Sequence, residues 1–334
     1  MELQLKNIGM IKEASVKLDG LTVIAGENDT GKSTVGKSLY LMIKSQNKSF
    51  QKDTKKYSLN ELMIIKIRTF MLKLFKSSNI VSSDGYISFN GNAIKSVKSE
   101  NLIQWEYEGN IQLQEEDIVF IETPLVWSFT DFFRDIAQVE SQMDIKLDYP
   151  HLMKDLNFKL HIKNAFDGFN IKDEMIELMG GEFKKDDVGK YYFDKNGKKI
   201  EIVNVATGIK YFGIFQILSE NNWLNKNTVF VLDEPEVHLH PKWQLKMAKI
   251  IVKLVKNGVK ILVNSHSPYM IEALQRYAEL EKVTADFYLA EDGYIKKEND
   301  RNSETLAKIF EKLSEPFDMF EEMDSQRMGK LING

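Results

Sequence analysis

Three short apolar runs stand out along the chain, and polar residues follow each of them. The runs are Leu21–Ala25, Val229–Leu232 and Val259–Val263. A continuous apolar run of this length is typical of a parallel strand that is covered on both faces. Between the second and third runs, Pro241–Lys256 has the pattern of a helix, with a proline suited to its first turn. Strand, helix and strand in this spacing predict a parallel pair joined by a crossover, and hence an α/β fold.

Shorter patterns fill much of the remaining sequence. Two segments with a central Asn-Gly pair, Tyr86–Ile94 and Tyr191–Ile200, predict β-hairpins. Apolar residues at helical spacing predict an amphipathic helix with a basic face over Leu59–Phe75. The other expected elements are short helices at Ser128–Gln142 and Met153–Asn164, a strand at Asp286–Ala290, and two C-terminal helices separated by Pro316. No heptad pattern spans several repeats, so we expect no long coiled coil.

The first apolar run leads into a segment that fits a phosphate-binding loop. Its residues are Gly26, Glu27, Asn28, Asp29, Thr30, Gly31, Lys32 and Ser33, followed by Thr34. Backbone N–H groups of such a loop point at phosphate oxygens, and the glycines allow backbone angles that a Cβ would forbid. Lys32 is placed to reach the β- and γ-phosphates, and the Ser33 hydroxyl to reach Mg²⁺. A phosphate-binding loop requires a strand before it and a helix after it, and a helix is predicted at Val35–Lys44. The alternative is an ordinary glycine-rich turn beside a strand, which would need no such helix.

The second run ends in two carboxylates, Asp233 and Glu234. The carboxyl ends of parallel strands are where open α/β sheets bind ligands. We expect Asp233 to support Mg²⁺, directly or through water, and Glu234 to act as general base on the attacking water. The alternative is that both residues merely cap the following turn.

The third run ends in Asn264-Ser265-His266-Ser267-Pro268. A parallel crossover would set His266 beside Asp233 and Glu234 on one edge of the sheet. A histidine there can hydrogen-bond a γ-phosphate oxygen and sense its loss. The alternative is that the His266 ring only forms hydrogen bonds within its own loop.

Together these motifs resemble the ATP-binding cassette heads of the SMC, RecF and OLD class. The matching segments are Gly26–Ser33, Asp233–Pro241, Ser265–Pro268, and the N-terminal strands suggested by Leu3–Gly9 and Ala14–Leu18. Within this class, the chain is similar to the small stand-alone ATPases of bacterial phage-defence systems, such as those of PARIS and Septu type. The resemblance implies a P-loop NTPase fold, an ABC-type ATPase head with a mostly parallel core sheet, and ATP and Mg²⁺ as ligands.

The resemblance also implies a signature loop that completes the nucleotide site of a partner subunit. The candidate contacts in this loop are Ala206, Thr207, Gly208 and Lys210. Thr207 stands where transporters have serine, and Ile209 replaces their second glycine, which argues against a transporter ATPase. A helix is expected to follow at Tyr211–Glu220. Because such sites form between heads packed head to tail, the resemblance implies a homodimer that closes on ATP.

Two further features follow from the resemblance. The glutamine usual at the lobe junction is absent, and Glu122 or Thr123 takes its place. The expected domains are an ATPase core from residues 1–45 and 200–275, an inserted helical/β second lobe at 46–199, and a C-terminal extension at 276–334 that packs on the core. OLD nucleases carry a Toprim domain after the ATPase, and nothing here resembles one. We therefore expect a separately encoded effector, either a nuclease or a toxin.

Composition narrows these expectations. The 334 residues include no cysteine, which excludes disulfides and thiolate metal sites, and the net charge of −4 gives no overall attraction to nucleic acid. No segment resembles a signal peptide or a membrane span, so we expect a cytoplasmic protein that does not associate with a membrane. His238 and His240 suggest a transition-metal site, but the resemblance places them in the loop that faces the partner head.

Charge is unevenly distributed along the chain. Residues 51–78 are mostly basic, which indicates either a solvated helix face or a contact for DNA or an acidic partner. Residues 315–324 are mostly acidic and are typical of a surface helix. Three functions stay open: a defence ATPase that controls an effector, a RecF-like repair ATPase acting on DNA, and a slowly hydrolysing ATP-dependent scaffold.

Overall fold

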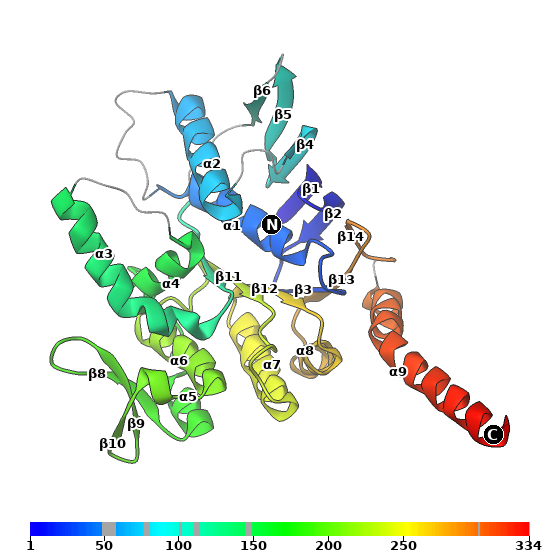
Figure 1. Ribbon diagram of the computed structural model, residues 1–334. Coiled ribbons are helices and arrows are strands. Elements are labelled where there is room, and N and C mark those ends of the chain that lie inside the picture. Colours follow the sequence, from blue (N-terminus) through cyan, green and yellow to red (C-terminus); the bar gives the residue numbers. More distant parts are fainter. Residues whose placement is uncertain are drawn as a thin grey trace.

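The computed structural model describes residues 1–48, 58–76, 81–99, 102–109, 114–143, 149–299 and 301–333. An eleven-stranded sheet crosses the molecule in the order β6-β5-β4-β1-β2-β14-β13-β3-β12-β11-β7 (Figure 1). Its strands are β1 (Glu2–Ile8), β2 (Ile11–Lys17), β3 (Leu21–Ala25), β4 (Val81–Phe89), β5 (Asn92–Ser99), β6 (Leu102–Glu108), β7 (Asp117–Ile121), β11 (Thr228–Asp233), β12 (Lys260–Ser265), β13 (Ala285–Glu291) and β14 (Tyr294–Lys296).

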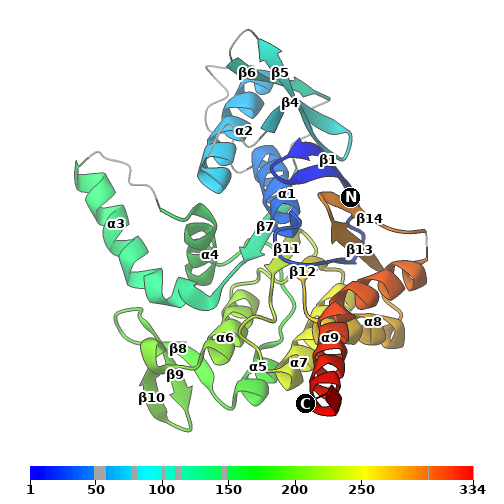
Figure 2. The same ribbon diagram turned by 45° about the vertical axis from the view of Figure 1, so that its right-hand side comes forward.

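Helices cover both faces of this sheet (Figures 1 and 2). They are α1 (Lys32–Gln46), α2 (Leu59–Phe75), α3 (Thr130–Met143), α4 (His151–His161), α5 (Lys172–Met179), α6 (Thr207–Glu220), α7 (Pro241–Lys256), α8 (Pro268–Glu281) and α9 (Asn302–Asn333), with short 3-10 helices η2 (Pro124–Phe129) and η3 (Ile202–Asn204). In the described chain, no helix is long and apolar enough to cross a membrane.

The three apolar runs form the centre of the sheet. The neighbouring strands β13, β3, β12, β11 and β7 are all parallel. Every residue of β3 and β11 is buried, because α1 and α2 pack on one face while α6, α7 and α8 pack on the other. The predicted α/β class and P-loop NTPase fold are therefore confirmed, and α7 spans the predicted residues.

Antiparallel strands extend the sheet beyond this parallel centre. β4 pairs with β1, and β5 and β6 follow it outward. A separate three-stranded sheet contains β8 (Glu182–Lys185), β9 (Tyr191–Lys195) and β10 (Lys198–Glu201). Both Asn-Gly pairs turn their hairpins with positive φ at each residue, as a type I′ turn requires. The predicted division into core, inserted lobe and C-terminal extension, at residues 45, 199 and 275, stays a prediction. Strands β4–β7 of the predicted lobe belong to the same sheet as the core strands.

The C-terminal prediction of two helices separated by Pro316 was wrong. One helix, α9, continues from Asn302 to Asn333 and includes that proline. Proline removes one backbone hydrogen bond and bends a helix, but it does not have to end it. Figure 2 shows α9 changing direction along its length.

Candidate nucleotide site

The predicted phosphate loop connects β3 to α1, and close packing explains its glycines. A Cβ on Gly26 would lie 2.3 Å from the carbonyl oxygen of Ala290. Gly31 has a φ of 91°, and a Cβ there would lie 2.4 Å from Cδ1 of Ile11. Gly31 also caps α1 without any side-chain hydrogen bond. The first N–H groups of α1 therefore have no side-chain cap, which suits the binding of an anion.

Lys32 is buried inside this loop. Its ammonium group donates hydrogen bonds to the carbonyl oxygens of Gly26, at 2.9 Å, and Glu27. Burial lowers the pKa of Lys32, while the nearby carboxylates of Glu234 and Asp233 oppose that shift. The lysine is thus held at the loop, where a phosphate group would give it a stronger, charged partner.

Asp233 and Asn264 lie opposite each other in the parallel register of β11 and β12. The Asn264 amide group donates to Asp233 Oδ1 at 2.7 Å and to the carbonyl oxygen of Lys32 at 3.1 Å. Burial raises the pKa of Asp233, and hydrogen bonds from Asn264 and Ser33 oppose this shift. Asn264 therefore joins the loop helix to the Asp-Glu strand, a role that the sequence motif did not reveal.

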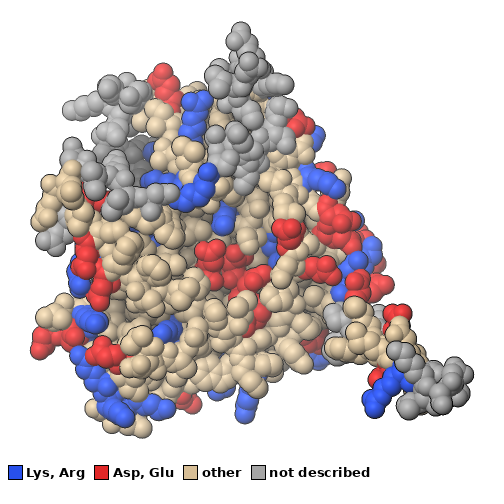
Figure 3. Space-filling model, viewed as in Figure 1, with Lys and Arg blue, Asp and Glu red and all other residues tan. Residues whose placement is uncertain are grey.

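The donor set fits Mg²⁺. Ser33 offers a hydroxyl and Asp233 a carboxylate, and these oxygen ligands suit a hard cation. A cation would also stabilise the buried Asp233 carboxylate, whose pKa burial raises. The Oδ1 atom of Asn264 is buried and has no hydrogen-bond partner in the described part of the chain. Figure 3 shows acidic side chains gathered near the ends of β11 and β12.

Glu234 stands in an uncommon backbone conformation. Its φ is 52°, and its N–H donates to the carbonyl oxygen of Asn264 at 2.9 Å. Non-glycine residues with positive φ are uncommon, and backbone strain of this kind is often found at active sites. Its Oε1 atom lies 3.4 Å from Nδ1 of His266, and both side chains are about one-third exposed, at 35% and 38%. The expected proximity of Glu234 and His266 is confirmed, while their catalytic roles stay predictions.

Glu236 holds the turn that carries His266. Its Oε1 atom accepts hydrogen bonds from the Ser265 hydroxyl at 2.7 Å, the His266 N–H at 2.8 Å and the Ser267 N–H at 3.2 Å. Its side chain is only 3% exposed. The sequence signal for this residue is a third carboxylate in the run after β11, next to the Asp233-Glu234 pair.

The predicted signature residues lie at the start of α6. This helix begins at Thr207, four residues before the expected start, and its N-cap Ala206 makes no side-chain hydrogen bond. Ala206 and Thr207 are exposed, whereas Gly208 and Lys210 are half-buried. A Cβ on Gly208 would lie 3.2 Å from the carbonyl oxygen of His238, so this helix end packs on the loop after β11. Contact with a partner's nucleotide stays a prediction.

His240 is explained without a metal. Its Nδ1 atom accepts a hydrogen bond from the Lys242 N–H at 3.3 Å and so caps α7. Within the described ranges, no group of three or more His, Asp or Glu residues is placed to hold a metal ion.

The two candidates for the lobe junction, Glu122 and Thr123, lie in different surroundings. Thr123 caps η2 by accepting a hydrogen bond from the Leu125 N–H at 3.3 Å. Glu122 follows β7, whose neighbour β11 ends at Asp233. The surrounding protein partly desolvates Glu122 and raises its pKa, with Lys37 opposing this shift and Asp233 adding to it. Thr123 thus has a local capping role, and a sensing role for Glu122 stays a prediction.

Comparison with known proteins shows what this chain resembles. Residues 129–271 match the family model described as AAA ATPase domain, which includes Asp233, Glu234 and His266 but not the loop at 26–33. A solved SMC head bound to the C-winged helix domain of ScpA matches with a TM-score of 0.51 and 13% identity, over 88% of this chain and 95% of that one. The expected fold resemblance to an SMC head is confirmed, and the family match supports an ATPase domain.

A curated relative makes the comparison more specific. The Septu protein PtuA of Bacillus thuringiensis is 24% identical over 306 residues, which cover 81% of this chain and 72% of the relative. ATPases of Septu type are among those that this chain resembles in its sequence motifs.

Proposed function

We propose that this protein binds and hydrolyses ATP and thereby regulates a separately encoded effector in bacterial defence against phages. The observation that carries the proposal is the parallel pairing of β3, β12 and β11. This pairing sets the loop with Lys32, the Asp233-Glu234 pair and His266 at one edge of the sheet. The similarity to the Septu protein PtuA supports the defence role.

Each residue has a distinct part in the proposed reaction. The N–H groups of residues 26–34 and the Lys32 ammonium bind the phosphates, and Ser33 and Asp233 hold Mg²⁺. When bound, Mg²⁺ neutralises negative charge on the phosphates. Glu234 accepts a proton from the attacking water, and His266 hydrogen-bonds the γ-phosphate. Glu236 holds the turn of His266 and acts only through it.

The active form in this proposal is a homodimer closed by ATP. Thr207 and Gly208 of one subunit would face the phosphates bound by the loop of the other. Exposure of Ala206 and Thr207 at an uncapped helix start supports this arrangement, because free N–H groups there can bind an anion. We place the protein in the cytoplasm, with a nuclease or toxin as its effector.

A second candidate function, ATP-dependent action on DNA, rests on α2. This helix has the predicted amphipathic pattern, with Met63, Ile67 and Phe70 buried. Arg68 and Lys73 of the same helix are exposed. A DNA role predicts binding that weakens steeply as salt rises, because bound phosphates release counterions.

The decisive experiment measures ATP binding and turnover of the purified chain and of Lys32→Ala. We expect the variant to lose binding or turnover, while a matched control at the exposed Lys6, Lys6→Ala, retains both. Turnover of Lys32→Ala close to that of the unmodified chain would overturn the assignment. Tight ATP binding with negligible turnover in the unmodified chain would instead indicate an ATP-dependent scaffold. Co-purification with the products of neighbouring genes tests the effector.

A further inference from the structure

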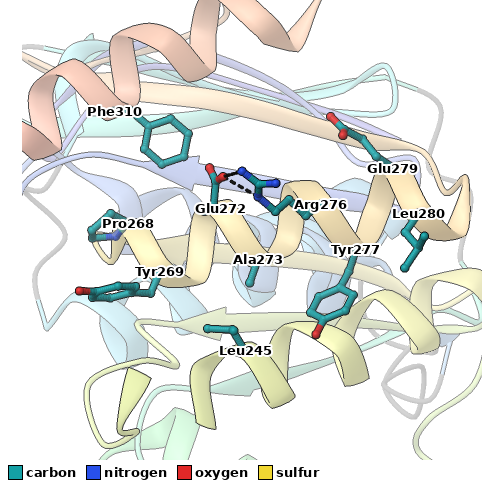
Figure 4. Close-up of a pocket in the computed structure, with 10 residues that line it drawn as sticks. All are labelled: Leu245, Pro268, Tyr269, Glu272, Ala273, Arg276, Tyr277, Glu279, Leu280 and Phe310. Atoms are coloured by element: carbon teal, nitrogen blue, oxygen red, sulfur yellow. Dashed lines mark hydrogen bonds and ion pairs between the residues drawn. The ribbon is translucent and has the colours of Figure 1, made fainter. Parts of the chain in front are cut away.

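A largely apolar groove of about 920 Å³ follows α8 between α7 and α9 (Figure 4). Tyr269, Ala273 and Tyr277 of α8 recur at helical spacing and face Leu245 of α7, whereas the Glu272–Arg276 ion pair lies on the side of α8 toward α9. Tyr269 is 57% exposed and Leu245 is 41% exposed. Exposed apolar surface of this extent, with a polar border, is typical of a contact site.

Exposed lysines of α7 lie next to the groove rather than in its lining. Lys242, Lys246 and Lys249 are exposed at helical spacing, and none of them forms an ion pair with a residue that the structure describes. Farther along α7, Lys253 pairs with Glu174 and Lys256 with Glu281. Leu245 of α7 lines the groove itself, whereas Lys246 and Lys249 line a neighbouring cavity that shares Tyr277 with the groove.

The distal half of α9 has the complementary pattern. The proximal half packs on the body of the protein, with Leu306 and Ile309 buried. The distal half projects away from the body, as Figures 1 and 3 show. Met323 follows Ile309 by two heptads and so continues the same apolar stripe, yet Met319 and Met323 are 58% and 57% exposed. The acidic residues interspersed with this stripe are Glu321, Glu322 and Asp324.

We propose that residues 319–333 of α9 dock into the α7–α8 groove of a second copy of this chain. The acidic helix would face Lys246 and Lys249, and its methionines, which adapt to irregular apolar surfaces, would cover Tyr269 and Leu245. The lengths agree, because fifteen helical residues span about 22 Å and the fourteen residues of α8 span about 21 Å.

The second copy is favoured over the same chain as the source of the helix. Phe310 of α9 already lines the groove, and the continuous helix then leads away from it (Figure 1). Reciprocal docking of two helices gives two equal contacts around a twofold axis, the commonest symmetry of protein dimers. This dimer uses none of the nucleotide-binding residues, so it forms without ATP and does not rest on the proposed function.

The first test measures self-association without nucleotide, by sedimentation over a series of protein concentrations. We expect the unmodified chain to dimerise, and Met319→Glu/Met323→Glu to weaken the association at least about tenfold, because two charges would enter the apolar groove. The control Met143→Glu changes an equally exposed methionine on α3 and should leave it unchanged. A monomeric unmodified chain at about 50 µM, near the range of weak specific complexes, would overturn the proposal.

The second test identifies the occupant by charge reversal. Lys246→Glu/Lys249→Glu and Glu321→Lys/Glu322→Lys should each weaken self-association, whereas an equal mixture of the two should form mixed dimers, because both of its contacts then join opposite charges. ATP binding and circular dichroism should be unchanged in every variant. If only the α9 variants lose association, the helices pair with each other rather than with the groove. If the mixture forms no mixed dimers, the groove takes a different partner.

Discussion

The Glu236 carboxylate accepts a hydrogen bond of 2.8 Å from the backbone N–H of His266, although the two residues lie on different loops. The same oxygen accepts hydrogen bonds from Ser265 and Ser267. A buried carboxylate after β11 thus fixes the turn after β12. Hydrogen bonds therefore link the two motifs that surround the proposed γ-phosphate site.

Replacing Glu236 by alanine should lower both stability and turnover. Glu236→Ala leaves several donors of the 265–267 turn without an acceptor, and each unsatisfied buried donor costs about 1–3 kcal/mol. We expect the free energy of unfolding to fall by about 3 kcal/mol in urea titrations. Glu236→Gln keeps an acceptor and should lose less than half as much. Equal losses in the two variants would show that the charge, rather than the hydrogen bonds, stabilises the turn.

Glu234→Gln should separate ATP binding from hydrolysis. The change removes the proposed base but leaves Lys32, Ser33 and Asp233 in place, so ATP should bind while turnover falls about 10²–10⁴-fold. Single-turnover kinetics and nucleotide-binding assays measure the two effects. Glu234→Gly provides a control for the backbone, since its φ of 52° favours glycine. If Glu234→Gln hydrolyses ATP normally or fails to bind it, Glu234 has a different role.

Local sequence patterns predicted the centre of the fold because local physics determines it. The apolar runs of β3, β11 and β12 must be covered on both faces, and an Asn-Gly pair favours the backbone angles of a tight hairpin. A helix end is less well determined by local patterns. The helix α6 starts at Thr207 rather than Tyr211, and its first turn packs at Gly208 against His238, a contact between segments that local patterns do not encode.

Contacts between distant segments were not predictable from these patterns. Lys44 at the end of α1 forms ion pairs with Asp117 of β7 at 2.7 Å and Asp155 of α4 at 3.2 Å. Lys159 pairs with Asp155 and donates to the carbonyl oxygen of Ile118 at 2.8 Å. Each residue reads as an ordinary surface charge in the sequence. These charged side chains are buried together only because α4 packs on β7 and near the C-terminal end of α1, the helix that follows the phosphate loop.

Disrupting this buried cluster should strongly destabilise the protein. Lys159→Met leaves two mostly buried carboxylates to share Lys44, and breaking a buried ion pair in this way costs about 3–5 kcal/mol. Lys159→Met/Asp155→Leu removes both partners and should recover part of the loss. The control Lys154→Met, on the more exposed side of α4, should cost less than about 1 kcal/mol. Urea unfolding compares the variants, and similar losses for Lys159→Met and Lys154→Met would contradict the interpretation.

The same cluster makes the folding stability of the protein depend on pH in the acidic range. Burial alone would raise the pKa of Asp155, but Lys159 and Lys44 lower it from 3.8 to about 2. A lowered pKa means that the stabilisation is fully present above pH 3.8 and is lost as the pH falls through about 2. The stability difference between the unmodified chain and Lys159→Met should therefore shrink from pH 6 to pH 2. A difference that stays constant over this range would show that Asp155 does not titrate as stated.

Mixing two inactive variants should test whether the nucleotide sites are shared between subunits. A glutamate at position 208 would repel the partner's γ-phosphate, while the loop at 26–33 of the same subunit still binds ATP. We expect Gly208→Glu to lose hydrolysis and ATP-dependent dimerisation. Gly208→Ala controls for the local contact, because its Cβ would lie 3.2 Å from the carbonyl oxygen of His238.

A Lys32→Ala subunit keeps an intact Gly208, and so supplies what the nucleotide site of a Gly208→Glu subunit lacks. In a mixed dimer, the intact loop of the Gly208→Glu subunit faces the intact Gly208 of the Lys32→Ala subunit, so one of the two sites works. An equal mixture should therefore recover about a quarter of the unmodified turnover, since random pairing makes half of the dimers mixed. Light scattering with ATP and turnover of the mixture decide the matter. Full activity of Gly208→Glu without any ATP-dependent association would show that each subunit completes its own site. Residues 204–210 would then have no role across the ATP-closed dimer.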